Sequence, residues 1–141
     1  MLRPRYGDRL ARRAVGTEAR RRQPLRIHHV ALRTRDLARL ESFYTLLLGL
    51  PVTRRNGDRS LWLSSGDAIL MIERASESEP TIPMGSMELV AFAIAASERD
   101  ATAARLRAAG IAIDAETPFT LYFRDPDGRR VGVSHFPDEK T

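Results

Sequence analysis

The sequence has no cysteine among its 141 residues, and this absence excludes several kinds of site at once. Disulfide bridges, zinc sites built from thiolates and cysteine nucleophiles all require that residue. The absence is compatible with a reducing compartment, and we expect the protein to be cytoplasmic. Long apolar stretches are also missing, since no run approaches the ~20 residues of a membrane span. We therefore expect a soluble protein.

Acidic residues are scarce at the start of the chain, so the net charge of +5 is unevenly distributed. Residues 1–26 hold nine arginines and two acidic residues, a balance of +7, whereas the remainder holds 14 basic and 16 acidic residues, a balance of −2. Proline and glycine interrupt the basic segment, which has no sustained apolar face, so we expect residues 1–25 to be a disordered extension. Basic tails attract nucleic acid by counterion release, but without aromatic interleaving or a recognition motif we do not expect a nucleic-acid partner.

The rest of the chain contains one pattern twice. Residues 28–53 and residues 88–114 both read as strand, helix and strand. Asp36 precedes Gly49 by 13 residues, and Ser97 precedes Gly110 by the same interval. Each pair places a helix-capping residue before a glycine that can end the helix. A repeat of this kind predicts a doubled fold with a pseudo-two-fold axis, and ligands tend to bind where such halves meet.

Each half is predicted to contain a strand, a helix and three further strands. In the first half, Asn56-Gly57 and Ser65-Gly66 are hairpin signals between strands. The predicted strands are residues 27–32, 50–55, 59–64 and 67–73, followed by 87–94, 111–116, 119–124 and 129–135. The first helix is expected to bury a stripe formed by Leu37, Leu40, Tyr44, Leu47 and Leu48, and the second a stripe of Ala103, Leu106 and Ala109.

The segment Asp125-Pro126-Asp127-Gly128 predicts a tight turn between the last two strands. Proline presets φ at the second turn position, and glycine takes a positive φ after Asp127. Residues 75–86 are rich in Ser, Glu and Pro, which indicates a linker between the halves. We therefore expect one domain at residues 26–137, with module one at 26–74 and module two at 87–137.

These motifs resemble the vicinal oxygen chelate superfamily, which contains glyoxalase I, the bleomycin resistance proteins and the extradiol dioxygenases. The resemblance lies in HHVALRTRDLARLESFYTLLLGL, the second strand–helix–glycine unit and YFRDPDGRRVGV. It implies an α+β fold in which two βαβββ modules form curled mixed sheets around a central cleft that binds a small molecule. It also implies that the chain forms a homodimer, in which the cleft is built either within one chain or by exchange of modules.

The resemblance implies a metal site at four positions, of which this sequence keeps one. Metal-dependent members usually hold a divalent ion with His and Glu residues from the first and last strands of each module. Those positions fall on His29, Met71, Leu89 and Gly132, and the last three are not ligands. Glu73 lies two residues from Met71, so the strand period sends it to the same face. We expect no cofactor, the alternative being Zn, Ni, Mn or Fe held by His29 and Glu73.

The dioxygenase branch is the least favoured enzymatic interpretation. Its members show a tyrosine shortly before the turn, which Tyr122 matches, and a glutamate after it, which Gly132 replaces. No histidine lies between Ile111 and Tyr122, where that motif would have one. Iron-dependent ring cleavage is therefore not expected.

Two hypotheses for function follow. The first is a binding protein of the bleomycin-resistance type with a degenerate metal site, which holds a small apolar or planar molecule in its cleft. Its lining is expected to include Trp62, Met71, Leu89, Ala91 and Gly132. The alternative is a lyase, isomerase or dioxygenase. In that case His29, Glu73 and Tyr122 are the candidate catalytic groups, acting with a metal or by acid–base chemistry.

Overall fold

The computed structural model of this chain describes residues 22–139. The expected extension at residues 1–25 therefore falls outside the described residues except for residues 22–25, which are exposed and contain no helix or strand. None of the described helices is long and apolar enough to cross a membrane.

Module one follows the predicted order of strand, helix and three strands. Its sheet has the strand order β1-β4-β3-β2, with β1 parallel to β4 and the other pairs antiparallel. The elements are β1 (His29–Thr34), α2 (Leu37–Ser42), η1 (Phe43–Leu47), β2 (Val52–Asn56), β3 (Ser60–Ser65) and β4 (Ala68–Arg74).

Module two repeats this topology with the strand order β5-β8-β7-β6, β5 being parallel to β8. The elements are β5 (Leu89–Ala93), η2 (Ala96–Glu98), α3 (Arg99–Ala108), β6 (Ala115–Glu116), β7 (Thr120–Arg124) and β8 (Arg130–Ser134). The predicted α+β fold of two βαβββ modules is thus confirmed, and within one chain the two sheets do not close on each other.

The first helix begins where the sequence predicts and then changes its geometry. Asp36 accepts a hydrogen bond from the Arg39 backbone N–H at 3.0 Å, as expected of an N-cap. From Phe43 to Leu47 the helix is π-helical, and Gly49 follows it with φ of 74°. Phe43 and Tyr44, at the start of this segment, are both buried in the core. The sequence pattern predicted one regular helix and not this change of geometry.

The second half departs from the prediction in two places. Ser97 was expected to cap the helix, but residues 96–98 form a 3-10 turn, and α3 begins at Arg99 with no side-chain cap. Leu106 and Ala103 are buried as expected, whereas Ala109 lies exposed at the C-cap. Of the strand expected at residues 111–116, only Ala115–Glu116 is a strand, and it pairs with Tyr122 and Leu121 of β7.

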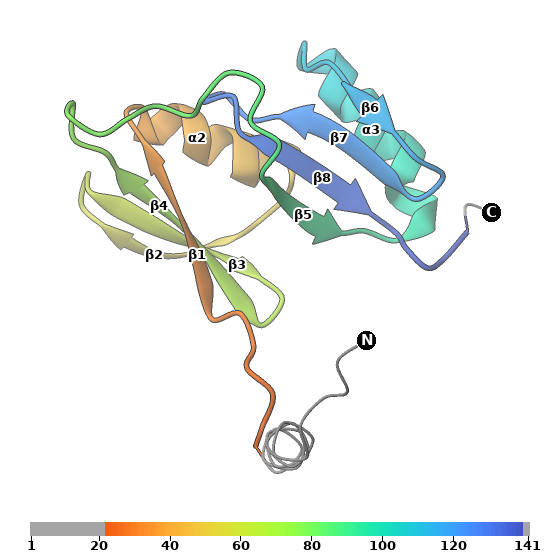
Figure 1. Ribbon diagram of the computed structural model, residues 1–141, viewed down its shortest axis with the longest axis horizontal. Helices are drawn as coiled ribbons and strands as arrows, with labels where there is room; N and C mark the ends of the chain where they lie inside the picture. The colour runs from red at the N-terminus through yellow and green to blue at the C-terminus, as the bar shows by residue number, and fades with distance from the viewer. Residues whose placement is uncertain (1–21, 140–141) are drawn as a thin grey trace, which may run out of the picture.

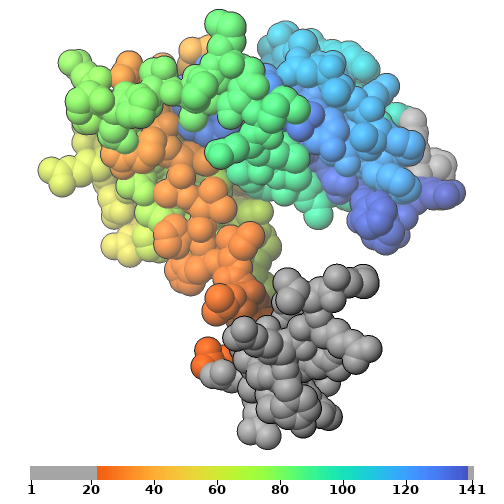
Figure 2. Space-filling model, in the orientation of Figure 1, coloured from red at the N-terminus to blue at the C-terminus, as the bar shows by residue number. Residues whose placement is uncertain are grey.

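The two modules lie side by side, and each sheet is covered by its helix on one face only (Figure 1). The core contains fifteen buried apolar side chains from both modules, so the helices and the sheet faces beneath them share one apolar interior. The linker between β4 and β5 runs across one edge of both modules (Figure 2). The opposite face of each sheet, which we call its inner face, is left free of helices.

Candidate functional site

The inner face of module one is defined by the alternation of its strands. Leu32, Leu61, Leu63, Leu70 and Ile72 are buried toward the helix, so their neighbours along each strand point the other way. The inner face therefore carries His29, Ala31 and Arg33 of β1, Ile69, Met71 and Glu73 of β4, Trp62 of β3 and Arg54 of β2. It brings together Met71 and Trp62, which lie opposite each other in the β3–β4 ladder.

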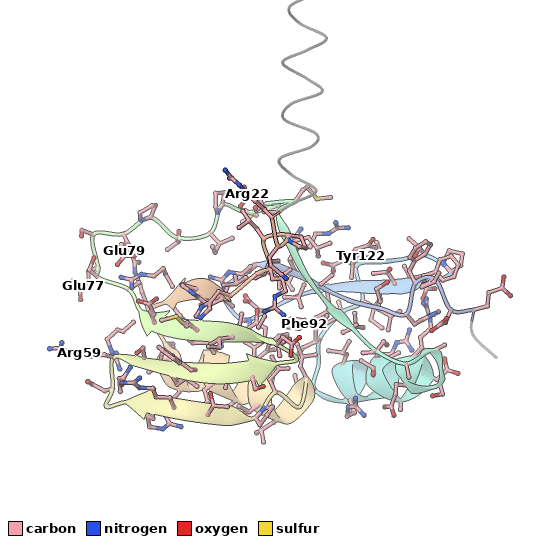
Figure 3. All side chains as sticks on the ribbon, turned by 90° about the horizontal axis from the view of Figure 1, so that it is seen from below. Arg22, Arg59, Glu77, Glu79, Phe92 and Tyr122 are labelled. Carbon is pink, nitrogen blue, oxygen red and sulfur yellow. The ribbon has the colours of Figure 1, made fainter. Side chains whose placement is uncertain are left out.

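The inner face of module two follows from the same alternation. Leu121, Phe123, Val131 and Val133 are buried toward the helix side. The opposite side carries Leu89, Ala91 and Ala93 of β5, Arg130, Gly132 and Ser134 of β8, and Tyr122 and Arg124 of β7. Figure 3 shows Tyr122 on the side of its sheet that faces away from α3. Ala91, Gly132 and Tyr122 form one continuous row across three strands.

The four positions implied for a metal fall into two pairs, one on each inner face. His29 pairs with Ile69 in the parallel ladder, and Met71 follows one same-face position later. In module two, Leu89 pairs with Arg130, and its Cδ1 lies 3.5 Å from the point where a Cβ on Gly132 would be. The members of each pair thus lie on adjacent strands of one sheet, and among residues 22–139 no hydrogen bond or ring contact joins one pair to the other.

His29 is exposed, and its ring contacts that of the preceding residue. The Nδ1 atoms of His28 and His29 are 2.9 Å apart, so one ring donates a hydrogen bond to the other. The third histidine, His135, is buried and has other partners. Its Nδ1 lies 2.5 Å from the Asp138 carbonyl oxygen and its Nε2 lies 3.2 Å from Arg99, which explains its place as a structural group.

Glu73 does not lie beside His29. In the β1–β4 ladder Glu73 pairs with Arg33, four residues along from the His29–Ile69 pair. At about 3.3 Å per residue this separates the two backbones by roughly 13 Å along the strand. The Glu73 carboxylate accepts a hydrogen bond from Arg33 Nη1 at 3.0 Å. A site that uses His29 and Glu73 of one chain together is therefore not formed.

Arg33 also binds Glu79 of the linker, a contact that the sequence did not reveal. Both carboxylate oxygens of Glu79 accept hydrogen bonds at 2.8 Å from the Arg33 guanidinium. This contact, with a further hydrogen bond from the Ser76 backbone N–H, lowers the pKa of Glu79 to about 2. The only available signal was the acidic composition of the linker, which does not specify a partner.

The residue types on the inner faces do not fit a divalent metal. Such an ion requires several oxygen or nitrogen donors, and catalytic sites generally keep at least three from the protein. The implied positions offer one imidazole, a thioether that suits soft metals, and two residues without a donor. Among residues 22–139, no group of three or more His, Asp or Glu side chains is placed to hold an ion.

A second polar cluster joins the two modules and was not predicted from the sequence. We call it the seam, and it consists of Tyr44, Asp125, Arg129 and the Arg33 carbonyl. The Tyr44 hydroxyl donates to Asp125 Oδ2 at 2.8 Å, and Arg129 Nη1 lies 2.6 Å from the same oxygen. Arg129 Nη2 also donates to the Arg33 carbonyl at 3.1 Å. Burial, followed by the negative charge of Asp125, raises the pKa of Tyr44. Asp125 was interpreted only as a turn residue and Tyr44 only as part of an apolar stripe.

Three cavities reach the inner faces only at their borders, through Ala31 and Arg33, Arg124, or Ala93. The largest, about 630 Å³, lies at the seam between the first helix and residues 109–112 and 124–126. A cavity of about 530 Å³ lies around residues 47–51 and 64–66. A cavity of about 400 Å³ lies under the linker. None of the three is lined by the proposed catalytic residues or by the residues proposed to line the cleft. These three cavities, formed by residues 22–139, therefore do not correspond to a pocket between the inner faces.

The sequence and the fold agree on the family. A sequence model described as the Glyoxalase/Bleomycin resistance protein/Dioxygenase superfamily matches residues 26–133. The chain belongs to this superfamily, which is the one that its motifs resembled.

Solved structures with the same fold include proteins with quite different titles. A lactoylglutathione lyase from Agrobacterium tumefaciens is 23% identical, with a TM-score of 0.64 over 82% of this chain and 96% of its own. The fosfomycin resistance protein FosX from Listeria monocytogenes, in complex with Mn(II) and 1S,2S-dihydroxypropylphosphonic acid, is 18% identical, with a TM-score of 0.66 over 79% and 90%. A glyoxalase/dioxygenase from Nostoc punctiforme is 22% identical, with a TM-score of 0.66 over 80% and 92%. At these identities the likeness establishes the fold alone.

Proposed function

We propose that this protein binds a small planar, largely apolar molecule between the inner faces of its two sheets and does so without a catalytic metal. The observation that carries the proposal is the set of side chains at the four implied metal positions. They supply one imidazole and three groups without a hard donor, beside the apolar surfaces of Trp62 and Ala91. A surface of this kind suits the face of a flat ring better than it suits an ion.

The enzymatic alternative is less well supported by the geometry. It requires His29 and Glu73 to act on one substrate or hold one ion, but Glu73 is bound by Arg33 at the far end of the strand pair. Tyr122 lies in the other module, and its ring is covered by Arg130 at 4.1 Å. These three residues therefore do not converge as acid, base and electrophile within one chain.

We infer that two copies of the chain complete the cleft. In one copy the inner faces are open, so Ala31 and Ala91 are exposed and Leu89 retains 41% of its surface. A pocket must cover most of the surface of its ligand, and a second copy would cover these faces while adding the same residues. Light scattering should give twice the chain mass. A monomer at micromolar concentration would contradict this part of the proposal.

Metal content tests the proposed function most directly. Protein purified without chelators should contain less than about 0.1 divalent ion per chain by elemental analysis, and native mass spectrometry should detect a co-purified organic molecule. His29→Ala should not change the metal content, and His28→Ala is the matched control because its ring lies beside His29. A stoichiometric metal that is lost in His29→Ala and retained in His28→Ala would overturn the proposal.

A further inference from the structure

Arg130 is an inner-face arginine whose charge has no acidic partner among the described residues. Its guanidinium carbon lies 4.1 Å from the centre of the Tyr122 ring, which is its one recorded interaction. The neighbouring inner-face arginines differ in this respect. Arg124 lies 3.5 Å from Asp114 and donates to two carbonyl groups, and Arg33 binds two glutamates. Arg130 therefore keeps its N–H donors available while the ring holds its position.

The surface beside this stack lacks projecting side chains. Tyr122 pairs with Gly132, and Gly132 pairs with Ala91, so the row across the sheet passes from an aromatic ring to two of the smallest residues. Ala91 is exposed, and Leu89 borders the row on the same strand. The row forms a strip beside the Tyr122–Arg130 stack. In this strip Ala91 is exposed, whereas Gly132 is buried, with Leu89 Cδ1 3.5 Å from the point where its Cβ would be.

The backbone does not require glycine at position 132. Its φ lies outside the positive region, and an added Cβ would meet its neighbours at 3.5 Å, an ordinary van der Waals distance. The other glycines with recorded positive φ, such as Gly110 and Gly128, are held by their turns instead. A side chain at Gly132 would contact Leu89 and Ala91, so its absence keeps the strip low beside the exposed Ala91, against which an aromatic ring could lie.

We propose that the Tyr122–Arg130 stack and the Ala91–Gly132 strip form a binding site for a planar aromatic carboxylate. The ring of such a ligand lies against the strip, and its carboxylate accepts hydrogen bonds from the edge of the Arg130 guanidinium. Arginine presents a planar fork that matches a carboxylate, and stacking on tyrosine limits the side-chain freedom that binding would otherwise remove. This inference rests on the proposed binding function and assigns a negative charge to its ligand.

Calorimetric titration of the full-length protein with two probes of the same shape tests the site. The probes are 2-naphthoate and its neutral analogue 2-naphthamide. Because a hydrogen bond to a charged group contributes more than one between neutral groups, naphthoate should bind about 10- to 100-fold more tightly. Arg130→Gln should bring the two affinities within about threefold, and Arg130→Lys should retain part of the preference.

Two further variants keep the result independent of folding. Arg107→Gln is the matched control, because Arg107 is an exposed arginine of α3, which covers the opposite face of the same sheet. It should change the preference for naphthoate by less than about twofold. Ala91→Leu fills the exposed strip and should weaken both probes together by tenfold or more, while thermal unfolding confirms that each variant is folded.

Four results would overturn the inference. The first is equal affinity for naphthoate and naphthamide, which would leave planar binding intact and remove only the charge. The second is a preference that disappears in Arg107→Gln and persists in Arg130→Gln. The third is binding of neither probe. The fourth is binding of inorganic phosphate as tight as that of naphthoate. The metal assay on His29→Ala decides the proposed function separately.

Discussion

The seam between the modules and the two ring-stacked arginines of the inner faces hold charge in opposite ways. At the seam, Tyr44, Asp125 and Arg129 are buried and satisfy one another at distances of 2.6–2.8 Å. On the inner faces, Arg130 and Arg54 are stacked over rings, and neither has a carboxylate partner among the described residues. A charge that is buried must be paired to be tolerated, whereas one kept at an open surface remains available to a ligand. The difference separates the scaffold of this molecule from the surface that we propose for binding.

The largest effect that would sharpen this comparison is expected at Asp125. Asp125→Ala leaves Arg129 buried without its carboxylate and should lower the free energy of unfolding by about 3–5 kcal/mol. Asp127→Ala in the same turn is the control, because Asp127 is 3.8 Å from Arg129 and partly exposed, and it should cost less than about 1 kcal/mol. Urea unfolding measures both. Equal losses would mean that the turn as a whole, and not the buried pair, holds the modules together.

A smaller effect is expected from removing a single hydroxyl at the seam. Tyr44→Phe removes the hydrogen bond to Asp125 and should cost about 1–2 kcal/mol. Tyr122→Phe on the inner face should change stability by less than about 0.5 kcal/mol, because no hydrogen bond of its hydroxyl is recorded among residues 22–139. The same urea unfolding curves decide between them, and a larger loss for Tyr122→Phe would reverse the proposed division.

The dependence of stability on alkaline pH offers a second measurement at Tyr44. Its pKa is raised in the folded protein, so the unfolded chain loses the tyrosine proton first. The wild type should therefore lose stability as the pH rises above about 10, the ordinary pKa of tyrosine. Tyr44→Phe lacks this contribution, and its unfolding midpoint should fall less steeply over the same range. Parallel curves for the two proteins would contradict the buried hydrogen bond.

The smallest effect is expected at the linker, which belongs to neither region. The pKa of Glu79 is about 2 in the folded protein, below its ordinary value of about 4.3. Its pairing with Arg33 therefore stabilises the fold above about pH 5 and is lost as the pH falls toward 2. The thermal midpoint of the wild type should fall slightly more over this range than that of Glu79→Gln. Glu77→Gln, also on the linker (Figure 3), is the control and should follow the wild type.

The sequence predicted the doubled βαβββ order because capping residues, glycines and the Asp-Pro-Asp-Gly turn are local signals that repeat at fixed intervals. It failed where the cause was not local. The π-helical segment begins at Phe43, whose ring lies 6.1 Å from that of Phe123 in the other module, and a contact between distant segments leaves no local signal. The strand expected at residues 111–116 was shortened because apolar alternation alone does not specify a pairing partner.

The candidate site was predictable only in part for the same reason. The family resemblance assigned Met71, Leu89 and Gly132 to positions facing the cleft, and the period of a strand added Glu73 to the same face as Met71. The separation of Glu73 from His29 depends on the β1–β4 register, which the strand patterns did not fix. The stack of Arg130 over Tyr122 joins two strands across a turn, and no motif in either strand predicts it.

The four-residue turn at Asp125–Gly128 has a consequence beyond its own hairpin. Its first carboxylate is tied to the helix of module one, and Arg129 just after it is tied to the end of β1, so a single loop sets the angle at which the two halves of the molecule meet. In a relative with a longer or shorter loop here, the angle between the two modules would differ. The width of the space between the modules would then depend on a segment that need not contact the bound molecule.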